Sequence, residues 1–146
     1  MKNIKYSSIV VFVFSCFAGF SQDCTLNVGG GNVETIVSVF QLNTIQKSKL
    51  EDIKEAYSIE AKSLEEEIEK LLAEHPQSTP QELELLGNKY IVLKNKLANK
   101  AEETDLKLLE SFNEKQYNRY IDLCKEAYRK PFVITPVVYK DSIAPK

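Results

Sequence analysis

The sequence predicts an all-α protein: a long antiparallel helical hairpin, with a short N-terminal helix, a third C-terminal helix and an extended C-terminal tail. Two consecutive stretches each carry one stripe of apolar residues at spacings of three and four, which is the pattern of an amphipathic helix. A short motif that begins helices also occurs twice, in the letters LNTIQ and FNEKQ. The five glycines lie mostly near the start of the chain, and helix-favouring Leu, Glu, Lys and Ala are frequent elsewhere.

The first 21 residues have the layout of a secretory signal peptide. Lys2 and Lys5 precede an apolar run from Ile9 to Phe14, and small residues follow before the expected cleavage ahead of Gln22. The run is shorter than the roughly 20 residues that a transmembrane helix needs. We therefore expect a periplasmic or secreted protein with no membrane span. Lipid anchoring through Cys16 is the alternative.

About 125 residues remain after this leader, which is the size of one domain. We expect a flexible N-terminal segment at 22–32, a helical domain at 33–130 and the extended tail at 131–146. Of the 19 basic side chains two belong to the leader, and 21 side chains are acidic, so the mature chain is mildly acidic. Without a basic stripe, we expect no nucleic-acid partner.

Two cysteines remain in the mature chain, Cys24 and Cys124. An even pair in an exported protein is compatible with a disulfide, and two unpaired thiols are the alternative. A bridge between them would close a loop of about 100 residues, for which the chain-entropy model gives about 4.7 kcal/mol of stabilisation.

The first long helix is expected over residues 44–74, where the apolar stripe begins at Leu50. Pro76 ends it, because the residue before a proline disfavours helical geometry. The second long helix is expected over residues 80–111. Thr79 is its N-cap, followed at once by a proline and, three residues after the cap, by a glutamate. Because the connection is only about five residues long, the two helices should pack antiparallel.

The repeated motif predicts the starts of two helices. In each copy an Asn is placed to cap the helix, the Gln three residues later to reach back as in a capping box, and the apolar residue before the Asn to act as a hydrophobic staple. The residues are Leu42, Asn43 and Gln46 in the first copy and Phe112, Asn113 and Gln116 in the second. The second copy starts a third helix, over about residues 114–129, which Pro131 ends.

The segments that flank these helices are less regular. Residues 33–40 are rich in β-branched side chains and would suit a strand, but they also fit helical spacing with Asn32 as a cap, and we expect a short helix. The tail contains three prolines and is expected to be extended. Its apolar residues are expected to pack on the helices; they are Phe132, Val133, Val137 and Val138.

No pattern in the sequence favours catalysis, a cofactor or a metal ion. The single histidine, His75, lies at the expected tip of the hairpin with no nucleophile beside it in the sequence. The GGG run lacks the Lys-Ser/Thr pair of a phosphate-binding loop. The glutamates between residues 65 and 69 point around a helix and do not converge. We expect no enzyme activity, no cofactor and no metal.

The two motifs, at 42–46 and 112–116, together with the signal peptide and the long hairpin, resemble the Spy/CpxP family of bacterial periplasmic proteins with its LTXXQ motif. The resemblance covers about residues 33–129. Asn replaces Thr in both copies and Phe replaces Leu in the second, but Asn caps a helix at least as well as Thr. The resemblance implies a thin all-α protomer that dimerises and acts as an ATP-independent chaperone or a stress-response regulator.

Two classes of function follow. One is a chaperone-like or envelope-stress protein that holds unfolded protein segments, although the resembled chaperones have a basic cradle and this chain is mildly acidic. The other is a structural or adaptor protein that docks one defined envelope partner. A hairpin this thin buries a limited fraction of its surface, so we expect a homodimer. The candidate client contacts are aliphatic residues off the main stripe: Ile59, Leu85, Ile91, Val92 and Leu106.

Overall fold

A computed structural model describes residues 22–138, which form four helices and no strand. The helices are α2 (Val33–Phe40), α3 (Thr44–Glu74), α4 (Pro80–Leu109) and α5 (Glu114–Glu126). The predicted all-α class is confirmed. The expected signal peptide, Cys16 and the end of the tail lie outside the described residues.

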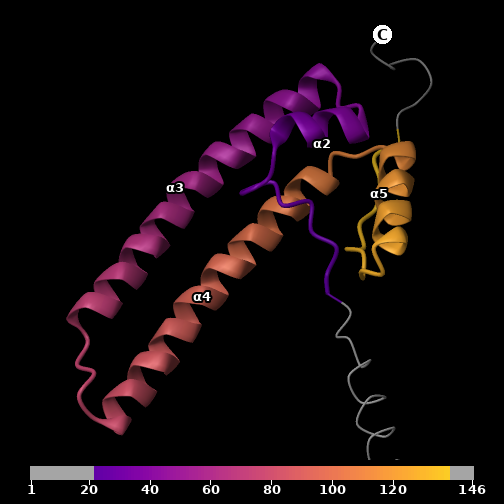
Figure 1. Cartoon of the computed structure of the whole chain (residues 1–146). Helices are drawn as coiled ribbons and strands as arrows, with labels where there is room; N and C mark the ends of the chain where they lie inside the picture. The colour runs from indigo at the N-terminus through magenta and orange to yellow at the C-terminus, as the bar shows by residue number, and fades with distance from the viewer. Residues whose placement is uncertain (1–21, 139–146) are drawn as a thin grey trace, which may run out of the picture.

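The helices α3 and α4 run side by side in opposite directions and dominate the molecule (Figure 1). Each begins with a capping box: Asn43 and Gln46 start α3, while Thr79 and Glu82 start α4. The glutamate of the second box accepts hydrogen bonds from two backbone N–H groups, which hold the pKa of the Glu82 carboxyl below its usual range.

Residues 33–40 form a helix, α2, as expected. The Asn32 side chain accepts a hydrogen bond from the N–H of Thr35, which begins the helix. Ile36 and Phe40 lie one turn apart and are both buried. The β-branched residues of this segment therefore serve a buried helical face instead of a strand, because no neighbouring strand among the described residues offers backbone partners.

Two helices end earlier than predicted. The expected 80–111 helix ends at Leu109, because the next residues form a turn that carries Phe112 into the core. The expected 114–129 helix ends at Glu126, and Tyr128 then adopts left-handed geometry with φ 54°. The N–H of Arg129 bonds the carbonyl of Cys124 across this turn. Both ends are decided by where the following residue must pack.

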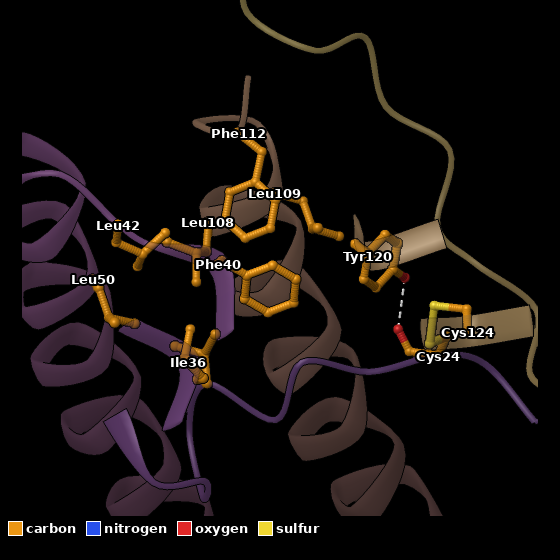
Figure 2. Close-up of a cluster of buried hydrophobic side chains, with 11 residues drawn as sticks. Cys24, Ile36, Phe40, Leu42, Leu50, Leu108, Leu109, Phe112, Tyr120 and Cys124 are labelled. Atoms are coloured by element: carbon orange, nitrogen blue, oxygen red, sulfur yellow. Dashed lines mark hydrogen bonds between the residues drawn. A yellow bond between two sulfur atoms is a disulfide. The ribbon is translucent and has the colours of Figure 1, made fainter. Parts of the chain in front are cut away.

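The hydrophobic core lies at one end of the hairpin, where α2, the start of α3, the end of α4 and α5 meet (Figures 1 and 2). The rings of Phe40 and Phe112 are in contact, with centroids 4.9 Å apart and planes tilted by 42°. Phe112 is the residue before the N-cap of α5. Further fully buried side chains come from both long helices and from α5: Leu50, Leu108, Leu109, Tyr120 and Cys124.

The rest of the hairpin has a much thinner core. We call the part of α3 and α4 between Tyr57 and Ala101 the arm. Its buried apolar side chains are confined to the seam between the two helices, and they are Ala61, Ile68 and Leu86. The arm is therefore a two-helix layer that projects from a compact base.

The N-terminal segment 22–32 was expected to be flexible, but it packs against the helices. Val28 is fully buried, and an added Cβ at Gly29 would lie within 3.0 Å of the Tyr57 ring, so this glycine permits a close approach. The segment is also tied to α5 by a disulfide between Cys24 and Cys124, whose Cα atoms are 5.6 Å apart. Tertiary contacts thus hold the segment in place, and these contacts could not be predicted from its local composition.

The chain after α5 is extended and returns along that helix. The hydroxyl of Tyr117 donates to the carbonyl of Phe132, and the N–H of Phe132 donates to the hydroxyl of Tyr120. Of the four tail residues expected to pack on the helices, only Phe132 is partly buried against the core; Val133 and Val138 are each 88% exposed and Val137 is 37% exposed. An extended chain turns alternate side chains to opposite sides, and the inward position after Phe132 is Ile134.

Candidate functional site

The two copies of the repeated motif have the same local geometry. In the first, Asn43 Oδ1 accepts from the N–H of Gln46 at 2.9 Å, and Gln46 Oε1 accepts from the N–H of Asn43 at 3.1 Å. In the second, Asn113 and Gln116 form the same two bonds at 2.9 and 3.0 Å. The staple residues Leu42 and Phe112 are both buried. Each motif thus begins a helix and places an apolar anchor in the core.

The two glutamines also bind each other. Gln46 Nε2 donates to Gln116 Oε1 at 2.8 Å, and Gln116 Nε2 donates to Gln46 Oε1 at 3.0 Å. Each Nε2 makes a second bond to a backbone carbonyl, that of Ser111 at 2.7 Å and that of Phe40 at 3.0 Å. Both amides therefore use their full hydrogen-bonding capacity inside the core. The pair joins the start of α3 to the start of α5, which capping alone did not predict.

Replacing either glutamine by leucine should lower the free energy of unfolding by about 2 kcal/mol, because each change leaves buried partners unpaired. The double variant Gln46→Leu with Gln116→Leu should lose less than the sum, because the bonds between the two amides can be lost only once. Urea unfolding of the four proteins measures this coupling. Additive losses would mean that the two capping boxes act independently.

Asp105 is a buried charged residue that the sequence analysis did not single out. It is 2% exposed and accepts three backbone bonds from the N-terminal segment. Asp105 Oδ2 accepts from the N–H groups of Leu26 at 2.7 Å and Asn27 at 3.0 Å, and Oδ1 accepts from that of Val28 at 2.9 Å. Burial raises the pKa of the Asp105 carboxyl, and the three N–H groups act in the opposite direction without overcoming it. The sequence carries no local signal for this role, because Asp105 lies in a segment that also contains Glu102, Glu103 and Lys107.

Four of the five candidate client contacts are exposed on the arm. Ile59 is 68% exposed, Leu85 50%, Ile91 56% and Val92 55%, whereas Leu106 is partly buried near the base. Two further exposed aliphatic residues near the tip of the hairpin, Leu72 and Leu83, were not among the candidates. The structure does not gather these residues into one pocket; they are distributed around a long two-helix surface.

One side of the arm is hollowed into a groove of about 590 Å³ between α3 and α4. Lys100 crosses it and forms ion pairs with Glu60 on α3 at 3.0 Å and with Glu103 on α4 at 3.1 Å. The hydrogen bond to the Glu60 carboxylate raises the pKa of the Lys100 ammonium, and the bond to Glu103 adds a smaller increase. The remaining lining residues include the apolar side chains Ile59 and Leu64. The groove can therefore receive an aliphatic side chain beside a charged pair.

Within residues 22–138 no three His, Cys, Asp or Glu side chains lie together so as to hold a metal ion. None of the helices described is both long and apolar enough to cross a membrane. No family model matches this chain, and comparisons with curated proteins and with solved structures find no match either.

Proposed function

We propose that this protein binds unfolded or partly folded protein segments in the bacterial envelope without nucleotide, holding them along the arm. The observation that carries the proposal is the exposure of Ile59, Leu85, Ile91 and Val92 on an arm whose only buried layer is the helix seam. A client that lies along the arm would remove these side chains from water, and the burial of apolar surface favours association. The resemblance to the Spy/CpxP family supports the same function.

The distribution of stabilising contacts between the base and the arm supports this proposal. The disulfide, the glutamine pair and Asp105 all stabilise the base, at the end of the hairpin where α2 and α5 lie (Figure 1). A rigid base allows the arm to present aliphatic side chains that its own fold does not bury. The Lys and Glu residues around them keep the free surface hydrated and allow weak, salt-sensitive contacts with a client.

Aggregation of a chemically denatured model substrate, followed by light scattering, tests the proposal. The protein from residue 22 onward should suppress aggregation at near-equimolar ratios. A variant with Ile91→Ser and Val92→Ser should need several times more protein for the same suppression, because it loses exposed apolar contact area. Both side chains are more than half exposed, so the helical circular dichroism should not change.

The matched control is Val133→Ser, which removes an aliphatic side chain that is 88% exposed on the tail and away from the arm. It should suppress aggregation as well as the unchanged protein. If the unchanged protein has no effect on aggregation, the holding function is wrong and the adaptor class, with one defined envelope partner, becomes the better description. If the control fails as badly as the arm variant, the arm is not the binding surface.

A further inference from the structure

A groove runs between α2 and α5 on the base, outside the arm. It consists of two hollows that share Val39 and Phe40 among their lining residues, so the hollows are adjacent. The first has a volume of about 230 Å³ and takes its α5 residues from Tyr120 onward, and the second, of about 240 Å³, takes them up to Arg119. Because the hollows follow one another along the helices, one elongated molecule can occupy both.

The first hollow, which we call the apolar hollow, is not filled by the folded chain. Figure 2 shows Ile36 and Phe40 of α2 on one side and Tyr120 and Cys24 on the other. Val39, at the junction of the two hollows, is still 37% exposed. The apolar lining side chains are Cys24, Leu26, Ile36, Val39, Phe40 and Leu123. A hydrocarbon chain in this hollow would leave water together with these side chains, which is favourable.

Several main-chain groups at the apolar hollow already have hydrogen-bond partners. The N–H of Cys24 donates to the carbonyl of Lys130 at 2.8 Å, and the carbonyl of Cys24 accepts from the Tyr120 hydroxyl at 2.6 Å. The carbonyl of Phe40 accepts from Gln116 at 3.0 Å. A peptide in this hollow would find these groups taken, and burying its own N–H and C=O groups without partners is costly. A hydrocarbon chain has no such groups.

The second hollow, which we call the cationic hollow, is lined by two positively charged side chains. Lys115 and Arg119 lie one turn apart on α5 and are both exposed. Within the described residues neither of them forms a salt bridge. The acidic residues of α2, of α5 and of the adjoining N-terminal segment line neither hollow; they are Asp23, Glu34, Glu114, Asp122 and Glu126. The cationic hollow is therefore suited to an anionic group.

We propose that the groove binds the anion of a medium-chain fatty acid, with its alkyl chain in the apolar hollow and its carboxylate beside Lys115 and Arg119. The planar guanidinium of Arg119 can donate two parallel hydrogen bonds to a carboxylate, and Lys115 adds a second positive charge. The order of the hollows gives the orientation, with the carboxylate toward the start of α5 and the end of the alkyl chain toward Leu123.

The size of the apolar hollow limits the ligand to one chain. A methylene group takes up about as much volume as a water molecule in the liquid, which is about 30 Å³. A hollow of about 230 Å³ therefore holds about eight carbon atoms. The two long acyl chains of a phospholipid would leave most of their length in water, whereas a single medium-length chain fits.

This inference goes beyond the proposed function and does not depend on it. The groove between α2 and α5 lies on the base, whereas clients are proposed to be held along the arm. A protein that fails to suppress aggregation can still bind a fatty acid, and the reverse holds as well. Binding of the fatty acid is measured without any client, so the two ideas can fail separately.

Equilibrium dialysis of the protein from residue 22 onward against fatty-acid anions of increasing length tests the apolar hollow. The affinity should rise roughly tenfold with each step of two carbons from butanoate to octanoate, because each added methylene group leaves water. It should change little from decanoate to dodecanoate, since the hollow is then full. The neutral alcohol octanol, which has the same chain without the charge, should bind at least tenfold more weakly than octanoate.

The carboxylate site is tested by the double variant Lys115→Gln with Arg119→Gln. It should bind octanoate as weakly as octanol and bind octanol as the unchanged protein does. Lys125→Gln is the matched control, because it removes a cation of the same helix that lines neither hollow, and it should bind octanoate normally. Val39→Trp should block both ligands by filling the junction of the hollows. Ser38→Trp, at the neighbouring exposed position outside the lining, should block neither.

Absence of saturable octanoate binding at millimolar concentrations would overturn the inference, as would a double variant that binds octanoate normally. An affinity that keeps rising to hexadecanoate would also overturn it, because that trend indicates nonspecific adsorption of the chain. A short peptide ending in leucine that binds more tightly than octanoate would overturn it in favour of a site for the carboxyl ends of proteins.

Discussion

Removal of the disulfide between Cys24 and Cys124 is expected to lower the free energy of unfolding by about 4 kcal/mol. The bridge spans a sequence separation of 100 residues, and closing so long a loop removes much entropy from the unfolded chain. Thermal unfolding of the double variant Cys24→Ala with Cys124→Ala, followed by circular dichroism, should show a midpoint more than about 10 °C below that of the oxidised protein.

A reductant provides the matched control for this prediction. Cys124 is fully buried and Cys24 nearly so, hence reduction should require partial unfolding of the protein by heat or urea. Once reduced, the unchanged protein should unfold near the midpoint of the double variant, and the double variant should not respond to reductant at all. Equal midpoints for the oxidised and reduced protein would show that the base is stable without the bridge.

Asp105→Ala is expected to lower the free energy of unfolding by about 3 kcal/mol, because it removes the acceptor of three backbone hydrogen bonds. The variant leaves the N–H groups of Leu26, Asn27 and Val28 without their acceptor, and unpaired buried N–H groups are costly. Asp105→Asn should lose less, because the amide retains one oxygen acceptor. Hydrogen exchange of these three amides should rise in the alanine variant while exchange in α4 stays slow.

The same residue predicts a dependence on pH with a definite sign. Since burial raises the pKa of the Asp105 carboxyl, the folded protein binds a proton more readily than the unfolded chain. The contribution of this group to stability therefore increases as the pH falls through the raised pKa. The unchanged protein should gain stability relative to Asp105→Asn on acidification, which urea unfolding at a series of pH values measures. A difference that stays constant with pH would contradict this sign.

Most helix starts were predictable because the signals are local. Asn43 and Asn113 are each three residues before a Gln, and the side-chain bonds that begin the helix join atoms within that span. The stripe of apolar residues along α3 is likewise a property of consecutive turns. Helix ends were less predictable, because α5 ends where Tyr128 must turn the chain toward the N-terminal segment.

The residues that stabilise the base could not be found in the same way. The bond between Gln46 and Gln116 joins residues 70 apart, and those between Asp105 and the N-terminal segment join residues 77 to 79 apart. No local pattern distinguishes a glutamine that only caps a helix from one that also pairs across the core, and an aspartate inside a helix usually faces water. The prediction that residues 22–32 are flexible differs from the structure for the same reason. The composition of this segment does not show that its N–H groups bond to Asp105, which is distant in the sequence.

By itself, the sequence determined the helical class, the caps and the spacing of the apolar stripes, because these follow from periodicity and from hydrogen bonds between residues three or four apart. Only the tertiary structure decided that the core gathers at one end, that Cys24 meets Cys124, and that Ile59, Leu85, Ile91 and Val92 remain exposed on the arm. The physical reason is that burial depends on which faces the chain brings together across long separations. A two-helix seam covers one side of each helix and leaves the other sides exposed.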